Sequence, residues 1–172
     1  MEVSILTPKC TLVPADLFEP DKASAMLSEV VGLEDDDVVS HVEVPQYGAV
    51  LLYADSSSDK YSKTIKDISG KGVGTLPEMF YILRDLRECS EYNKLVASRH
   101  DGWLYLAIAK GDSLSLANVY KASDFTTAEY FLFLALKSLQ LNPEQTTVCW
   151  RGPLEQEDEM SLCRYFKSVE TI

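Results

Sequence analysis

The chain has 172 residues, of which 46% are hydrophobic and 25% charged, so it is long enough for one good core or two small subdomains. Its net charge of −11 argues against nucleic acid as a partner, because phosphates need a surface rich in Lys and Arg. The same charge disfavours binding to an anionic membrane. Only two histidines are present, so we do not expect a histidine-based metal site.

The four cysteines are Cys10, Cys89, Cys149 and Cys163. None of them forms a C-x-x-C pair and each has apolar neighbours, a pattern typical of buried free thiols. We therefore predict reduced, structural cysteines in a cytoplasmic protein. No basic start followed by an apolar run marks a secretory signal, and the longest apolar run, residues 130–136, is far shorter than a membrane span.

The first part of the chain predicts strands separated by short helical segments. Residues 3–7 and 38–44 alternate and are rich in β-branched side chains, which predicts strands. Residues 48–54 are continuously apolar, as in a strand covered on both faces. Residues 21–32 carry apolar side chains at helical spacing. The acidic run 34–37 lacks the spaced ligands of a calcium loop, so we predict a solvated turn.

A boundary between two domains is predicted near residue 75. Residues 55–74 are polar and rich in Ser and Gly. A helix is predicted over 76–89, with Pro77 in its first turn, and would connect the two halves. We therefore divide the chain into a first domain, 1–75, and a second domain, 76–172.

The second domain begins with a predicted hairpin. The pair Asp101-Gly102 opens an alternating apolar run, and the tight turn Gly111-Asp112 folds this run back on itself. Thr126 and Glu129 have the spacing of a capping box. The helix that they open, 127–140, is apolar on almost every side, so we expect it to be buried.

The rest of the domain alternates between strand and helix. A β-branched strand is predicted over 146–150, and an acidic helix follows with Leu162, Tyr165 and Phe166 pointing inward. Residues 167–172 predict a last short strand. An antiparallel meander followed by alternating helices and strands is the order of a ribonuclease-H-like unit.

Four runs of sequence carry a resemblance to a known family: PKCTLVPADLF, GAVLLYA, HDGWLYLAIAKGDSLSLANVYKASDFTTAEYFLFLALKSLQLNPEQ and SLCRYFKSV. They resemble an uncharacterised domain-of-unknown-function family typical of Bacteroidetes, with an expected actin-like fold of the sugar kinase and heat-shock ATPase superfamily. The likeness extends over most of the chain. It implies an α/β fold of mixed sheets with flanking helices, in two related ribonuclease-H-like subdomains. Members of the family usually begin with another β-hairpin, so the first subdomain, 1–75, is expected to be truncated.

The resemblance also implies a nucleotide site. In active members of the actin-like superfamily each half supplies an Asp-x-Gly hairpin around the phosphates, with the Asp orienting a metal ion and its water. The matching positions here are Asp101 and Gly102, with Gly152 where a Gly-Gly pair would approach the adenosine. The spacer residue of the hairpin is missing, the bulky residues 103–105 follow it, Gly152 precedes a proline, and the first hairpin is absent. These departures imply a degenerate, non-hydrolysing relative.

Two further groups have the residue types of a site. The glycines Gly70, Gly72 and Gly74 with Lys71 could bind an anion through backbone amides, although they match neither the Walker nor the dinucleotide motif. A flexible interdomain loop is the alternative interpretation. His100 and Asp101 could form an acid–base pair, but no Ser or Cys nucleophile is identifiable near them by spacing.

These observations favour a non-enzymatic actin-like binding or scaffold module of the cytoplasm that acts through protein contacts and needs no cofactor. The alternative is a nucleotide-binding protein or ATP-dependent phosphotransferase that uses ATP and magnesium, with Asp101, Gly102 and Gly152 lining the cleft between the two halves. A third hypothesis is a homodimer formed through the open edge of the first sheet, because an unpaired edge invites strand addition.

Overall fold

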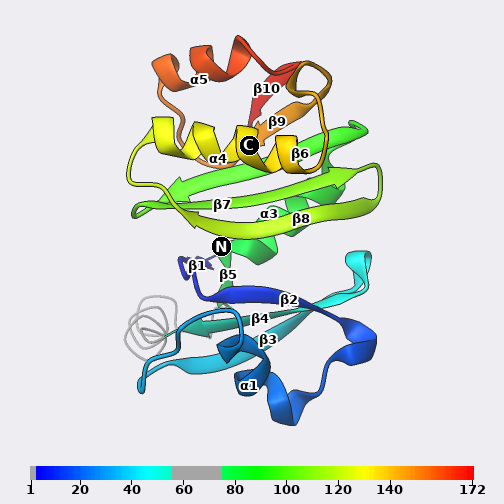
Figure 1. Cartoon of the computed structure of the whole chain (residues 1–172), viewed down its shortest axis with the longest axis vertical. Helices are drawn as coiled ribbons and strands as arrows, with labels where there is room; N and C mark the ends of the chain where they lie inside the picture. The colour runs from blue at the N-terminus through cyan, green and yellow to red at the C-terminus, as the bar shows by residue number, and fades with distance from the viewer. Residues whose placement is uncertain (1–2, 56–74) are drawn as a thin grey trace. The chain divides into compact units, whose positions relative to one another are not determined.

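The computed structural model describes residues 3–55 and 75–172, and the chain divides into two compact units, Met1–Tyr81 and Ile82–Ile172 (Figure 1). The predicted boundary was at 75/76, whereas this division lies inside the helix α3 (Glu78–Glu88). The three residues before α3 form strand β5 (Thr75–Pro77), so Pro77 ends a strand and does not open the helix.

The first unit contains a three-stranded antiparallel sheet. Its strands are β2 (Cys10–Pro14), β3 (Val38–Val44) and β4 (Ala49–Asp55), with β4 in the centre. A separate pair is formed by β1 (Val3–Ile5), which runs parallel to β5. The short helix α1 (Ala23–Ser28) packs on the sheet, where its Leu27 joins Val50 and Leu52 in an apolar core. Every residue of β4 from Ala49 to Ala54 is buried, which confirms the strand covered on both faces.

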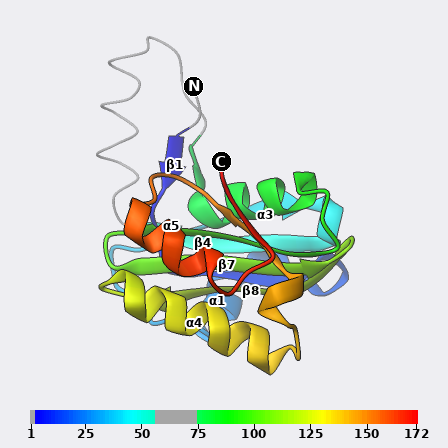
Figure 2. The ribbon, with the colours of Figure 1, turned by 90° about the horizontal axis from the view of Figure 1, so that it is seen from above.

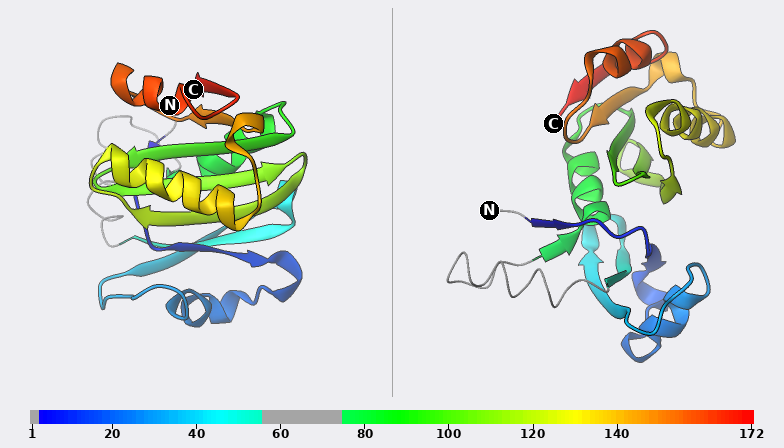
Figure 3. Two further views of the ribbon diagram at one scale, coloured as in Figure 1. Left: turned by 45° about the horizontal axis from the view of Figure 1, so that its top comes forward. Right: turned by 90° about the vertical axis from the view of Figure 1, so that its left-hand side faces the viewer.

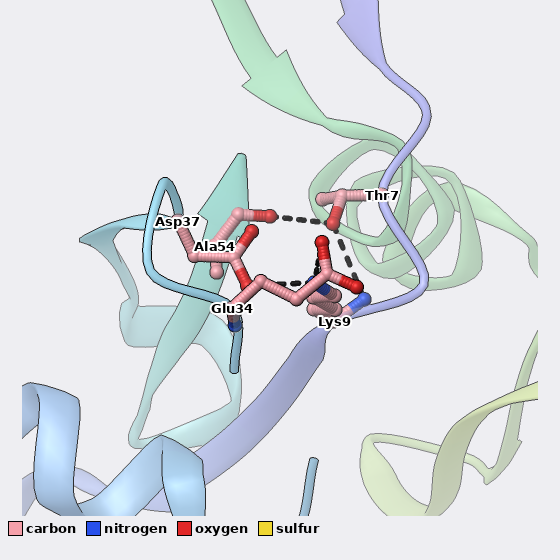
Figure 4. A network of polar contacts seen from close by, with 5 residues as sticks. All are labelled: Thr7, Lys9, Glu34, Asp37 and Ala54. Atoms are coloured by element: carbon pink, nitrogen blue, oxygen red, sulfur yellow. Dashed lines mark hydrogen bonds and ion pairs between the residues drawn. The ribbon is translucent and has the colours of Figure 1, made fainter. Parts of the chain in front are cut away.

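A polar network joins the chain before β2 to the turn before β3 (Figure 4). The hydroxyl of Thr7 donates to the carbonyl of Ala54 at 2.6 Å, and Lys9 Nζ donates to Asp37 Oδ2 at 2.6 Å. Asp37 also accepts the backbone N–H of Glu34 at 2.7 Å. The prediction of a solvated acidic turn is therefore wrong for Asp37, whose side chain is only 2% exposed and ion-paired. The Glu34 N–H and then Lys9 hold the pKa of Asp37 below its usual value.

The second unit contains a five-stranded mixed sheet in the order β10-β9-β6-β7-β8. The strands are β6 (Asn93–His100), β7 (Trp103–Lys110), β8 (Ser113–Lys121), β9 (Thr147–Trp150) and β10 (Ser168–Thr171). The first three form an antiparallel meander, β9 runs parallel to β6, and β10 runs parallel to β9. This element order confirms the meander and the alternation predicted for this half.

Helices cover both faces of this sheet (Figures 2 and 3). The helices α4 (Phe125–Ser138) and α5 (Gln156–Cys163) lie on one face, and the part of α3 within this unit lies on the other. Side chains alternate along β9 accordingly, because successive residues of a strand point to opposite faces. Val148 and Trp150 enter the core under α4 and α5, whereas Arg151 contacts α3 and Cys149 contacts Cys89, which directly follows α3.

The helix α4 differs from its prediction in two respects. It begins at Phe125, because the side chain of Asp124 accepts the N–H of Thr127 at 2.7 Å and caps the helix, so the predicted capping box at Thr126 is not the cap. The helix is also not buried on every side, since Tyr130 is 60% and Leu134 44% exposed. An apolar composition alone does not bury a helix that has only one sheet to pack against.

Two other burial predictions are corrected by the structure. Leu162 and Phe166 are buried as expected, but Tyr165 is 48% exposed. Of the cysteines, Cys149 is buried, Cys10 and Cys89 are partly exposed, and Cys163 is exposed at the last position of α5. In the part of the chain that the structure describes, no helix is long and apolar enough to cross a membrane.

Candidate functional site

The three predicted nucleotide-site residues lie at one edge of the five-stranded sheet. Strands β6 and β9 are parallel neighbours, so their carboxyl ends meet at the same edge, where α/β sheets usually bind ligands. Asp101 and Gly102 follow β6, and Gly152 follows β9. A Cβ placed on Gly152 would lie 3.8 Å from His100 Cε1, which shows how close the two segments are. We call this edge of the sheet, formed by residues 100–102, 151–152 and 172, the carboxyl edge.

The turn at the carboxyl edge has the geometry of a tight two-residue hairpin. Asp101 and Gly102 both have positive φ angles, 50° and 78°, and they connect His100 with its strand partner Trp103. Two successive left-handed residues are what a type I′ turn requires, and Asp-Gly is among its preferred pairs. The carbonyl of Gly102 accepts the N–H of Ala122 at 2.7 Å. The turn is thus held by the meander itself, with the Asp101 side chain exposed to solvent.

The amides beside Gly152 are already engaged in the sheet. Gly152 has a φ of 91°, and its N–H donates to the carbonyl of Ile172 at 3.1 Å. The N–H of Arg151 donates to the carbonyl of Ala97 at 2.7 Å. An anion-binding nest needs backbone N–H groups that point at the ligand. These two amides instead extend the ladders that join β9 to its neighbours.

The charged side chains near the carboxyl edge are mostly acidic. Arg99 donates to the carbonyl of Ser123 at 3.3 Å and acts electrostatically on Asp124 and Asp158. Burial, and then Glu155 and Glu157, raise the pKa of Asp158 despite the opposing charge of Arg99. Such an environment is unfavourable for a triphosphate unless a cation accompanies it.

A further cation at this edge, Arg151, forms an ion pair. Its Nη1 lies 2.9 Å from Asp85 Oδ2 on α3, and Asp85 also accepts from Arg84 at 3.0 Å. Asp85 is 9% exposed, so this pair is largely shielded from water. Among residues 3–55 and 75–172, no group of three or more His, Cys, Asp or Glu side chains is placed to hold a metal ion.

The model of the family described as "Protein of unknown function (DUF3822)" matches residues 1–169. The chain belongs to the DUF3822 family. This confirms the resemblance to a domain-of-unknown-function family. No curated protein matches the chain in sequence.

The solved structures that resemble this DUF3822 protein establish its fold. A Bacteroides thetaiotaomicron protein described as having an actin-like ATPase fold and unknown function is 18% identical, with a TM-score of 0.77, over 99% of this chain and 67% of that one. The DUF3822 protein therefore has the actin-like ATPase fold that the resemblance implied.

Two other solved structures show weaker similarity. One is a chain of the PilM–PilN type IV pilus biogenesis complex, 14% identical with a TM-score of 0.48 over 95% of this chain and 65% of that one. The other is the cytoplasmic domain of EpsL, an inner membrane component of the type II secretion system of Vibrio cholerae. It is 14% identical with a TM-score of 0.45, over 86% of this chain and 58% of that one.

Sequence reasoning grouped Asp101, Gly102 and Gly152 and missed the charged residues around them. The Arg151–Asp85 pair joins residues 66 apart in sequence, so no local residue spacing predicts it. The position of Arg151 two residues after Cys149 does indicate that both point to the same side of β9. The predicted anion loop, Gly70, Lys71, Gly72 and Gly74, lies outside the described residues and remains a prediction.

Proposed function

We propose that this DUF3822 protein is a non-catalytic actin-like module that acts by binding another protein. In this proposal the second unit is a ribonuclease-H-like subdomain, supported by its strand order, and residues 1–75 belong to the first subdomain. The observation that carries the proposal is the engagement of the Arg151 and Gly152 amides in backbone hydrogen bonds at the carboxyl edge. A phosphate bound there would have to replace bonds that the sheet already makes.

The electrostatics of the carboxyl edge support the same conclusion. Asp101, Asp124 and Asp158 outnumber Arg99 there, the charge of Arg151 is paired with that of Asp85, and the whole chain carries a net charge of −11. Actin-like enzymes bind a highly negative nucleotide with the help of a divalent cation. Two features of the carboxyl edge therefore disfavour nucleotide binding: its backbone amides already form hydrogen bonds, and the surrounding charge is negative.

We place the protein-binding surface on α4. Tyr130 and Leu134 are four residues apart, so they lie on the same side of the helix, and both are exposed. The neighbouring Phe133 packs edge-to-face against the half-exposed Tyr165, with ring centroids 5.2 Å apart. Together Tyr130, Phe133, Leu134 and Tyr165 form what we call the α4 surface. Exposed aromatic and aliphatic side chains grouped in this way are typical of protein interfaces.

The partner that fits the α4 surface is a basic protein segment with apolar side chains. Tyr165 lies just after the carboxyl end of α5 and extends this surface from α4 to that helix, whose other end, the first turn, is acidic, with Glu157, Asp158 and Glu159. Ser161 of α5 donates to Glu129 of α4 at 2.8 Å, which holds the two helices together. An amphipathic basic helix would thus find apolar contacts on α4 and opposite charge on α5.

A titration with nucleotide tests the absence of a phosphate site. We expect the thermal midpoint to stay within about 1 °C when millimolar ATP or ADP and magnesium are added, for the natural chain and for Asp101→Ala alike. A ligand present at 100 times its Kd would stabilise the fold by about 2.7 kcal/mol, which corresponds to roughly 5–10 °C for a chain of this size. Stabilisation of the natural chain that Asp101→Ala abolishes would support nucleotide binding instead.

The alternative function is nucleotide binding at the carboxyl edge, with ATP and magnesium as ligands. The observation in its favour is that Asp101, Gly102 and Gly152 all lie at this edge, next to one another in space. The titration above separates the two proposals, because only the alternative requires a magnesium-dependent shift that is lost in Asp101→Ala.

A peptide titration tests the α4 surface directly. The probe is a synthetic amphipathic helix of Lys and Leu, and its comparison peptide has Glu in place of Lys. We expect the basic peptide to bind the natural chain and to lose at least 10-fold in affinity for Tyr130→Glu/Leu134→Glu. The matched control is Val30→Glu, which changes a residue 62% exposed in the first unit. Equal loss in the control, or equal binding of both peptides, would contradict the assignment.

A further inference from the structure

Two cysteine thiols of the second unit lie in contact. Cys149 Sγ is 3.4 Å from Cys89 Sγ, although the residues are 60 positions apart in sequence. Cys149 lies on the inner strand β9 and is 3% exposed, whereas Cys89 follows the last residue of α3 and is partly exposed. One thiol of the pair can therefore be reached from solvent and the other is covered.

This contact follows from the way α3 lies along β9. Cys89 directly follows the helix and its N–H donates to the carbonyl of Asp85, so the two residues lie on one side of it, and Cys149 and Arg151 are two residues apart along the strand and its extension. Asp85 meets Arg151 and Cys89 meets Cys149, so the helix runs antiparallel to the strand with two contacts in register. The two sulfur atoms are thus already in contact at 3.4 Å, and a disulfide of about 2.05 Å requires them to approach further.

Two charged side chains surround the thiols. Lys94 is 3% exposed, and its ammonium group donates to the carbonyl of Cys89 at 2.5 Å. Glu170 Oε2 lies 3.9 Å from Cys149 Sγ. Burial, and then the hydrogen bond to Cys89, raise the pKa of Cys149 well above its usual range, while Lys94 acts in the opposite direction. Cys149 thus remains a thiol at neutral pH, and the more exposed Cys89 is the sulfur that an oxidant meets first.

We propose that Cys89 and Cys149 are a redox-active pair that hydrogen peroxide converts into an intrachain disulfide between the end of α3 and β9. In the first step the Cys89 sulfur attacks one peroxide oxygen and gives up its proton, the O–O bond breaks, and Cys89 becomes a sulfenic acid while the departing hydroxide takes up that proton as water. In the second step the Cys149 sulfur attacks Cys89 Sγ, its proton goes to the departing hydroxyl group, and a second water leaves. Two thiols are oxidised and one peroxide is reduced to two waters.

The disulfide would secure the segment through which the chain passes from the first unit to the second. The helix α3 begins in the first unit and ends in the second. Oxidation attaches its carboxyl-terminal end covalently to β9 and closes a long loop, which stabilises the fold by restricting the unfolded chain. Reduction releases this end, which is then held by the Asp85–Arg151 pair and by packing.

The test uses a Cys10→Ser/Cys163→Ser protein, which retains only the two cysteines of the pair. After treatment with hydrogen peroxide we expect both thiols to be lost to a thiol reagent and the intact mass to fall by two hydrogens. Tryptic digestion should yield a linked peptide containing Cys89 and Cys149, and dithiothreitol should reverse each change. The thermal midpoint should rise by roughly 5 °C or more.

Single variants provide the controls. Cys89→Ser and Cys149→Ser in the same background should show neither the linked peptide nor the rise in thermal midpoint. If Cys149→Ser fails to fold, phenylarsine oxide replaces it as a probe, because it binds two adjacent thiols of the folded protein and should bind one molecule per chain. The proposal is overturned if both thiols stay free at peroxide concentrations that oxidise the exposed Cys163 of the natural chain. It is equally overturned if Cys89 passes to a sulfinic acid without forming the linked peptide.

Discussion

The ion pair between Asp85 and Arg151 should be a principal contact that holds α3 on the five-stranded sheet. Asp85 Oδ2 accepts from Arg151 Nη1 at 2.9 Å, and Asp85 Oδ1 accepts from Arg84. The substitution Asp85→Asn keeps the size of the side chain and removes its charge. Arg151 then keeps its charge at a site where its side chain is only 23% exposed. We expect the second unit to lose stability.

The magnitude follows from the burial of the pair. Removing one partner of a fully buried ion pair lowers the free energy of unfolding by about 3–5 kcal/mol, and a hydrogen bond to a charged group contributes about 1.5–3 kcal/mol to it. Asp85 is 9% exposed but Arg151 retains some access to water, which places this pair at the lower end of both ranges. We therefore expect Asp85→Asn to lower the free energy of unfolding by about 2 kcal/mol.

The assay is urea unfolding followed by tryptophan fluorescence. Both tryptophans of the chain, Trp103 and Trp150, lie in the second unit, so the signal reports that unit alone. Asp112→Asn is the matched control, because Asp112 pairs with Arg87 of the same helix but is 81% exposed. An exposed pair contributes little, so the control should change stability by less than about 0.5 kcal/mol.

A double-mutant cycle with Arg151→Gln separates the pair from other effects. We expect the effects of Asp85→Asn and Arg151→Gln to be non-additive, with a coupling energy of at least about 1 kcal/mol. Additive effects, or a loss in Asp112→Asn as large as that in Asp85→Asn, would refute the reasoning that burial gives this pair its strength.

Two further predictions concern the same unit. Gly152→Ala should lower the free energy of unfolding by about 1–2 kcal/mol, because a φ of 91° is strained for any L-residue. The new Cβ itself would meet only His100, at 3.8 Å, so the loss should come from the backbone. An unchanged urea midpoint would contradict this prediction. The Thr127 N–H holds the pKa of Asp124 below its usual value, so the stabilisation by this cap is complete at neutral pH and is lost as the pH falls below about 4 through the lowered pKa. Asp124→Asn, which can still cap α4, should show a smaller loss of thermal midpoint between pH 7 and pH 3 than the natural chain, and identical pH profiles would contradict this assignment.

Local features of the sequence determined most of the second unit. Alternating apolar residues on either side of Asp101-Gly102 and Gly111-Asp112 predicted the meander, because side-chain periodicity and turn chemistry act over a few neighbouring residues. The resemblance to a domain-of-unknown-function family correctly implied the actin-like fold. Placing Asp101, Gly102 and Gly152 together required only the knowledge that β6 and β9 are parallel neighbours.

The tertiary structure alone decided which residues meet from distant parts of the chain. Lys9 pairs with Asp37, Asp85 with Arg151, and Cys89 with Cys149, across 28, 66 and 60 positions of sequence. Each contact depends on how one element packs against another, and residue spacing carries no signal for that. For the same reason the composition of α4 could not tell which of its apolar side chains would face solvent. Secondary structure arises from interactions between near neighbours, whereas burial, pairing and the character of a site arise only when the sheet and its helices assemble.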